Sequence, residues 1–341
     1  MTTQQKICID RVLPRDLNRP QHTITLEDGR AGAIIDFRKL WINGSTLRVR
    51  FLEGTEQQKA LAKEQANWWA EHANLTFLFN DDTDAEIRIS FDPDDGAWSY
   101  IGTDAMDIPR NQATMNLGFL DGGTAAHEFG HAIGLHHEHQ NPDGGIVWNE
   151  RVVIDALSGP PNNWSEAQIR HNVLKKYTAD QVRGTKFDPD SIMLYFFPDS
   201  WVQNGNGTSA NEVLSDMDSA FIASEQAYPG RISNEITEIP VINTTGTSAD
   251  IGKLGEEDLF KFIVSSDGQH IIETGGQTDV VMKLFGPDSD TNLIAEDDDG
   301  GTGRNSRIVT DLIEGEYIVQ IRHYNTRRGT GSYSIVVSTE G

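Results

Sequence analysis

The sequence predicts an α+β domain followed by an all-β sandwich domain. In the first part of the chain, segments with alternating apolar residues follow segments with helical periodicity, as in a sheet that carries helices. After about residue 240 only short alternating segments separated by Gly, Asp and Asn remain, which is typical of a β-sandwich. We expect an N-terminal segment over residues 1–40, a first domain over 41–235 and a second over 245–341.

The first domain is predicted to begin with a strand and a helix. Residues 45–54, STLRVRFLEG, alternate apolar and polar side chains as a half-buried strand does. Residues 57–74 are rich in helix formers, with Leu61, Trp68 and Trp69 on the expected inner face. Three more strands are expected over residues 75–80, 85–92 and 113–119.

The rest of this domain is expected to be mainly helical. One helix is predicted to start at Thr124, as its N-cap, and to stop at Gly134. Helical segments are also expected over residues 149–157 and 164–177. A closing helix is predicted over residues 214–228, before a Pro-Gly pair that ends it.

The second domain contains an acidic turn between predicted strands. Asp297, Asp298 and Asp299, followed by two glycines, form a carboxylate-rich loop suited to calcium, which prefers several oxygen ligands. The alternative is an acidic turn without a ligand. The strands are expected over residues 258–264, 269–276, 280–286, 307–312, 316–324 and 331–338.

The chain is strongly acidic, with 52 acidic and 28 basic residues and a formal net charge of -24. Such a surface repels nucleic acid and anionic membranes, so neither is expected as a partner, whereas it attracts metal cations and basic peptides. No apolar run approaches the length of a transmembrane helix, and the first residues lack the pattern of a signal peptide.

Cys8 is the single cysteine of the chain, so no disulfide can form within it. Because zinc binds thiolates, one hypothesis is that Cys8 blocks a zinc site in a latent form. The alternative, which the sequence favours, is that this cysteine is buried as a small apolar residue.

The most informative stretch is HEFGHAIGLHHEH, which starts at residue 127 and holds five of the ten histidines. On a helix, residues four apart lie about 40° apart around the axis and about 6 Å apart along it. His127 and His131 can therefore bind one ion. Gly134 can adopt a left-handed conformation that turns the chain and brings His137 to the same point. The spacing is that of a three-histidine zinc site.

Three neutral imidazoles would leave the charge of zinc largely intact and one position open for a water, whose pKa would fall toward about 7. Glu128 is placed to take a proton from this water and pass it to a leaving amine. The predicted chemistry is peptide-bond hydrolysis. The alternative, ordinary histidines on a surface or core helix, is disfavoured by the match at five fixed positions.

Three neighbours of the predicted ligands have other expected roles. His136 should point away from His137, and His139 lies beyond the turn, so both are predicted to be structural or solvated. Glu138 could orient the third ligand or bind a buried cation. It could equally be an exposed acid.

A second motif is SIMLY, residues 191–195. A methionine in an apolar run is usually part of a core. Together with HEFGHAIGLHHEH, however, SIMLY resembles the metzincin clan of zinc metallopeptidases and, within it, the astacin family. The resemblance covers residues 40–230 and implies a metzincin-type catalytic domain, with a twisted mixed sheet and an active-site helix.

This resemblance implies roles for several residues. Met193 would form the hydrophobic base beneath the zinc. Tyr195 would be a phenol near the metal that can ligate it and swing to stabilise the oxyanion, and a neutral tyrosine is a suitable donor for that purpose. Residues 113–119 would be the edge strand that pairs with an extended protein or peptide substrate. Secretion is implied as well.

The second domain resembles the bacterial pre-peptidase C-terminal domain, a β-sandwich appended to many secreted proteases. The pattern is matched in order over residues 250–338, by GEEDLFKF, IETGGQTDVVMKLF, IAEDDDGGTGRNSRI, LIEGEYIVQIRHY and TGSYSIVV.

The leading hypothesis is therefore a zinc-dependent endopeptidase in which Glu128 activates a zinc-bound water. One alternative is a secreted binding or adhesion protein with a vestigial zinc site. Such a relic would be expected to have lost Glu128 or a ligand, and none is lost. A zinc hydrolase with another kind of substrate is disfavoured by the SIMLY motif and the candidate edge strand.

Overall fold

The computed structural model describes residues 34–35, 39–159, 163–177, 186–224, 226–229, 246–253, 256–324 and 329–339. Cys8 lies outside these residues. The chain divides into two compact units, residues 1–231 and 232–341. The prediction of an α+β unit followed by an all-β unit is confirmed. Among the described residues, no helix is both long and apolar enough to cross a membrane.

The first unit is built on a five-stranded mixed sheet with the strand order β3-β2-β4-β6-β5. Strands β3, β2, β4 and β6 are parallel, and β5 is antiparallel to β6. The bounds are β2 Thr46–Phe51, β3 Thr76–Phe79, β4 Ile87–Ser90, β5 Ala97–Ser99 and β6 Met115–Leu117.

The prediction that residues 113–119 form the edge strand is wrong. Strand β6, which lies within this range, is hydrogen bonded to β4 on one side and to β5 on the other. The sheet ends instead at β5. This strand is three residues long, so it leaves no recognisable alternation in the sequence.

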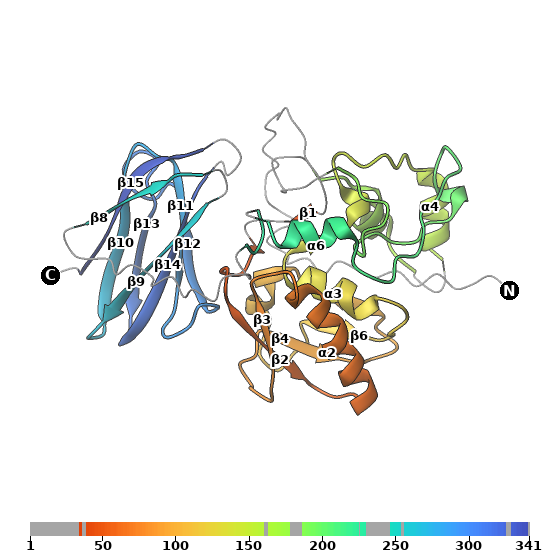
Figure 1. Ribbon diagram of the computed structural model, residues 1–341, viewed down its shortest axis with the longest axis horizontal. Coiled ribbons are helices and arrows are strands. Elements are labelled where there is room, and N and C mark those ends of the chain that lie inside the picture. The colour runs from red at the N-terminus through yellow and green to blue at the C-terminus, as the bar shows by residue number, and fades with distance from the viewer. Residues whose placement is uncertain are drawn as a thin grey trace. The chain divides into compact units, whose positions relative to one another are not determined.

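Two helices of the first unit pack against each other, α2 Glu56–Ala70 and α3 Thr124–Ala132 (Figure 1). Helix α2 begins with a capping box, in which the hydroxyl of Thr55 accepts a hydrogen bond from the backbone N–H of Gln58. Trp69 of α2 and Phe129 of α3 are fully buried in the shared core. The two helices thus form a layer that packs against the sheet.

The other elements of the first unit are short. The predicted helix over 164–177 is split into an α-helix and a π-helix, and the predicted closing helix ends at Ile222 rather than at residue 228. The chain turns there because Tyr228 enters the core, where its hydroxyl donates to the carbonyl of Ile133 at 2.8 Å. The bounds are β1 Ile34–Ile35, η2 Gly102–Asp107, β7 Leu135–His136, η3 Glu138–Gln140, α4 Glu150–Leu157, α5 Glu166–Ile169, the π-helix η4 Arg170–Leu174, η5 Asp199–Trp201 and α6 Asp216–Ile222.

The second unit consists of two four-stranded antiparallel sheets, with the orders β13-β10-β15-β8 and β12-β11-β14-β9. Phe262, Met282 and Leu284 from one sheet and Ile272 and Ile335 from the other form its core. This arrangement is a β-sandwich. The bounds are β8 Thr247–Ile251, β9 Glu257–Val264, β10 Gly268–Gly276, β11 Val280–Phe285, β12 Leu293–Asp297, β13 Arg307–Leu312, β14 Gly315–His323 and β15 Gly331–Thr339.

Candidate active site

Helix α3 is positioned by α2 rather than by a cap of its own. Its N-cap is Gly123, and Thr124, the predicted N-cap, is the first helical residue. The hydroxyl of Thr124 donates to a carbonyl of the preceding turn instead of accepting from the helix. Gln65 of α2 replaces the cap: its Oε1 accepts from the N–H of Ala126 at 3.0 Å, and its Nε2 donates to the carbonyl of Gly122 at 2.7 Å.

The end of α3 reverses the chain at Gly134. This glycine has a φ of +103°, in the left-handed region that side chains with a Cβ rarely adopt. Its N–H donates to the carbonyl of His131 at 2.8 Å. The chain continues through β7, and His137 follows directly.

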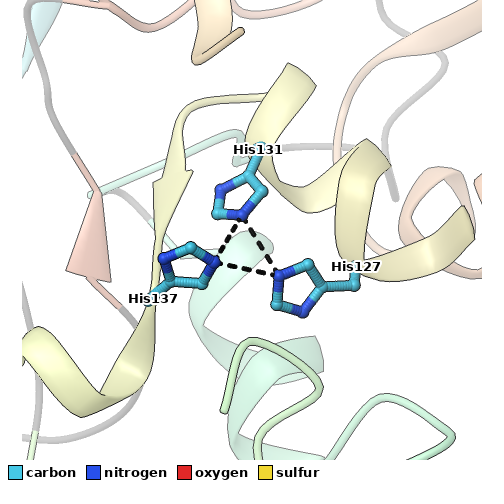
Figure 2. A group of neighbouring side chains, drawn as sticks. All are labelled: His127, His131 and His137. Atoms are coloured by element: carbon cyan, nitrogen blue, oxygen red, sulfur yellow. Dashed lines mark hydrogen bonds between the residues drawn. The ribbon is translucent and has the colours of Figure 1, made fainter. Parts of the chain in front are cut away.

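The three predicted ligands converge. Figure 2 shows the rings of His127, His131 and His137 with one nitrogen of each directed toward the others. The Nε2–Nε2 distances are 3.1 Å between His127 and His131, 3.0 Å between His131 and His137, and 3.2 Å between His137 and His127. Within the described part of the chain, no other group of three or more His, Cys, Asp or Glu side chains is close enough to hold a metal ion.

The protonation of two rings shows that this geometry fits a cation. Nδ1 of His127 lies 2.8 Å from the carbonyl oxygen of Ile192, and Nδ1 of His131 lies 2.8 Å from that of Leu135. Because a carbonyl only accepts, each Nδ1 carries the proton, and each Nε2 of the neutral ring presents a lone pair. Lone pairs about 3 Å apart repel unless a cation lies between them. Zinc with nitrogen ligands at about 2.0–2.1 Å in a tetrahedral arrangement separates them by about 3.3 Å, close to the spacing found.

Glu128 lies on α3 directly after the first of these histidines, and its side chain is completely buried. Both imidazoles of α3 and this carboxylate therefore belong to one rigid element. The helix fixes the spacing of their backbone positions, and contacts outside the helix, with the carbonyls of Ile192 and Leu135, orient the two rings.

Met193 packs against a glycine between the two histidines of α3. A Cβ added to Gly130 would collide with the Met193 sulfur and would lie 3.1 Å from a ring carbon of Trp69. The thioether therefore occupies space that only glycine leaves free. Gly130 is part of the site, although the sequence motifs did not single it out.

Tyr195 lies beside two of the three histidines. Its ring centroid is 5.0 Å from that of His127 and 4.4 Å from that of His137, and its hydroxyl is hydrogen-bonded to Nε2 of His137. The backbone here is fixed because the hydroxyl of Thr208 donates to the carbonyl of Tyr195. The hydroxyl of Tyr195 thus lies next to the point toward which the three Nε2 atoms are directed.

The neighbours of His137 are buried, so they are neither solvated nor an exposed acid. His139 stacks on His137 with a centroid distance of 5.2 Å, and its Nε2 donates to the carbonyl of Asn172 at 3.0 Å. The His136 ring packs against that of Tyr177, with a centroid distance of 4.5 Å. Glu138 accepts from Nδ2 of Asn141 at 2.8 Å and from a backbone N–H at 2.9 Å. Burial raises the pKa of Glu138 to about 8, against these hydrogen bonds, which lower it.

The candidate calcium loop of the second unit has a different geometry. Oδ2 of Asp297 accepts from the backbone N–H of Gly300 at 2.8 Å and from that of Arg307 at 2.7 Å. Asp298 and Asp299 are exposed. Partial desolvation of the carboxyl and the neighbouring carboxylates of Asp299 and Asp297 raise the pKa of Asp298 above its ordinary value. Among the described residues, these three aspartates do not form a group whose oxygens are close enough to bind one ion.

Comparison with known proteins identifies relatives of the first unit. The chain matches the model of the astacin family, which is described as a peptidase family, over residues 34–208. The solved structure of myroilysin is 36% identical, with a TM-score of 0.54, over 56% of this chain and 96% of that chain. Astacin-like metalloprotease toxin 5 of Loxosceles gaucho is 29% identical over 160 residues, which are 46% of this chain and 77% of the toxin.

Some relatives are much longer than the matched region. Tolloid-like protein 1 of Homo sapiens is 28% identical over 163 residues, which are 46% of this chain but 14% of the human protein. The chain therefore matches only a small part of the length of such relatives.

Proposed function

The chain belongs to the astacin family of peptidases, and on that premise we propose that it is a zinc-dependent endopeptidase. The observation that carries the proposal is the convergence of three histidine Nε2 atoms to within 3.0–3.2 Å of one another. The zinc would be held by His127, His131 and His137. When bound there, it would supply a Lewis acid that lowers the pKa of water and polarises a carbonyl.

We assign Glu128 the role of general base and then general acid. Its carboxylate accepts a proton from the water that attacks the peptide carbonyl, and then passes this proton to the nitrogen of the leaving amine. The buried position of Glu128 supports the assignment, because it separates the proton transfer from bulk solvent. Its place on α3 fixes its distance from two of the histidines.

Tyr195 is the candidate donor to the oxyanion. Its hydroxyl, now hydrogen-bonded to Nε2 of His137, can ligate the metal at rest. Rotation away from His137 would direct the O–H to the oxygen that becomes negative during attack. Met193 supports the site from below, through its contact with Gly130.

An extended peptide would add to the sheet at β5. The N–H of Tyr100 donates to Thr114, and that of Gly118 donates to Gly96, both at 2.9 Å. Since hydrogen-bonded and non-hydrogen-bonded pairs alternate in an antiparallel ladder, the backbone groups of Ala97 and Ser99 point away from β6. We propose that these groups bind the backbone of the substrate. Because Ala97 and Ser99 are each 1% exposed in this structure, this binding requires that side of β5 to be uncovered.

The experiment is to measure zinc content and casein cleavage for the unaltered protein, for Glu128→Ala and for Glu56→Ala. Glu56 is a helical glutamate whose side chain is 93% exposed, so its replacement is the control. We expect one zinc in all three proteins, and a fall in cleavage of about 10²–10⁴-fold in Glu128→Ala alone. Undiminished cleavage by Glu128→Ala would disprove the assigned mechanism. Bound zinc without cleavage by any of the three would favour the binding or adhesion protein instead.

Two finer expectations accompany the proposal. We propose that the protein is secreted, as the family resemblance implies, and that the second unit is a pre-peptidase C-terminal domain. Its all-β fold supports the latter. Calcium at Asp297, Asp298 and Asp299 stays a prediction of the sequence.

A further inference from the structure

We infer that Asp218, on α6, is a positioning residue for the metal ligand His127, and that it acts through the backbone of the turn Ser191–Met193. The inference rests on the zinc site proposed above. Asp218 follows both sequence motifs in the chain and belongs to neither. Two successive contacts link it to His127, and a third fixes Asp218 itself.

The first contact fixes the His127 ring. Nδ1 of His127 donates to the carbonyl oxygen of Ile192 at 2.8 Å. The position of that oxygen therefore decides the rotation of the ring and the direction of its Nε2. Partners of this kind hold the tautomer and orientation of metal-binding histidines.

The second contact fixes the residue that carries this oxygen, from the peptide on its N-terminal side. The backbone N–H of Ile192 donates to Oδ2 of Asp218 at 2.8 Å, and the hydroxyl of Ser191 donates to Oδ1 at 2.7 Å. The same hydroxyl accepts from the N–H of Met193 at 3.1 Å. One carboxylate therefore holds two consecutive residues of the turn, and through Ser191 it also holds the third.

The third contact fixes Asp218 itself. The hydroxyl of Ser215 accepts from the N–H of Asp218 at 2.9 Å, while Oδ2 of Asp218 accepts from the N–H of Ser215 at 3.1 Å. The Ser215 hydroxyl donates to Asp188 at 2.6 Å. Asp218 is completely buried, so its carboxylate does not exchange these donors for water. The N-terminus of α6 is thus an anchor for the turn.

The same unit contains a matched capping box without such a link. In α5, Ser165 and Gln168 exchange the same pair of bonds, at 2.9 and 3.3 Å. Gln168 is exposed and lies at the same N3 position of its helix as Asp218 does in α6. Replacing Gln168 removes a cap alone, whereas replacing Asp218 also removes the support of the metal ligand.

The experiment is to measure the zinc dissociation constant by competition with a chelator for the unaltered protein, Asp218→Ala, Asp218→Asn and Gln168→Ala. We expect Asp218→Ala to weaken zinc binding about 10–100-fold. Asp218→Asn should recover most of the affinity, because its amide oxygen can still accept from Ile192. Gln168→Ala should bind zinc as tightly as the unaltered protein.

The inference is overturned if Asp218→Ala lowers the unfolding free energy but binds zinc with unchanged affinity. Should Asp218→Ala not fold, Ser191→Ala takes its place: a several-fold weaker zinc affinity supports the inference, and an unchanged affinity overturns it. His127→Ala separates this question from the proposed function. If the unaltered protein binds no zinc, or if His127→Ala binds it equally well, the proposed site fails. If the unaltered protein binds zinc through His127 and the affinity is unchanged in Asp218→Ala and Ser191→Ala, the positioning role fails while the proposed site stands.

Discussion

The two units each contain a cluster that the sequence predicts to bind a cation, and the structure arranges these clusters differently. In the first unit, His127, His131 and His137 bring their Nε2 atoms within 3.0–3.2 Å of one another. In the second, Asp297 directs one carboxylate oxygen to two backbone N–H groups, and Asp298 and Asp299 are exposed.

The difference comes from the backbone that carries the side chains. Residues four apart on a helix share a face, and the turn at Gly134 adds a third side chain from the same direction. Successive residues of a strand point to opposite sides, and β12 ends at Asp297. A high density of acids in a sequence therefore does not by itself make ligands converge, whereas the helical spacing of histidines does.

The largest expected effect is that of His131→Ala against Asp298→Ala. Removing one of three zinc ligands should abolish stoichiometric zinc and lower casein cleavage by about 10³-fold or more, since the metal supplies several kcal/mol of transition-state stabilisation. Asp298→Ala should retain zinc and cleavage. Zinc is measured by elemental analysis, and a His131→Ala protein that keeps one zinc per chain would break the contrast between the two clusters.

The next effect is that of Gly130→Ala. The added methyl would displace the Met193 side chain, whose sulfur occupies the space next to the position of the new Cβ. We expect a loss of about 1–3 kcal/mol of unfolding free energy, with weaker zinc binding. Gly145→Ala is the control, because a Cβ there meets nothing within 4 Å. Urea unfolding of both variants measures the difference, and equal stability would show that Met193 adjusts freely.

The ligands could be predicted from the sequence because helix geometry is local, whereas the supports of the site could not. Gln65 caps α3 from 61 residues away in the chain, and no local pattern marks that pairing. The family resemblance implies an edge strand at residues 113–119, whereas the sheet ends at β5, whose three residues leave no recognisable alternation in the sequence. Gly130 is necessary because of Met193, which is distant in sequence but adjacent in space.

A smaller effect tests the acidic loop directly. Asp297→Ala should lower the unfolding free energy of the second unit by about 1–2 kcal/mol, because two backbone N–H groups lose their acceptor. Asp299→Ala should change it by less than about 0.5 kcal/mol. Thermal unfolding with and without calcium completes the comparison. If calcium raises the unfolding temperature of the unaltered protein and both variants abolish this rise, the loop binds calcium. The contrast with the histidines would then be wrong.

The smallest expected effect concerns a carboxylate between the sheets of the second unit. Asp258 on β9 accepts from the hydroxyl of Tyr333 on β15 at 2.6 Å, and burial raises the pKa of Asp258 above its ordinary value. The folded unit then holds this proton to higher pH than the unfolded chain, whose Asp titrates near about 3.9. The stability that the proton contributes is present below that pH and is lost as pH rises through the raised pKa.

Asp258→Asn keeps an acceptor for Tyr333 but cannot titrate. The unfolding free energy of this variant relative to the unaltered protein should therefore increase as the pH rises above about 4, whereas that of the exposed Asp311→Asn should not. Urea unfolding at several pH values measures both. If the unfolding free energies of Asp258→Asn and of the unaltered protein change with pH in parallel, burial of Asp258 does not contribute to the pH dependence of stability. A divergence would show that a buried carboxylate of the second unit contributes to the packing of its sheets. In the first unit, by contrast, the three histidines direct their Nε2 atoms to one point.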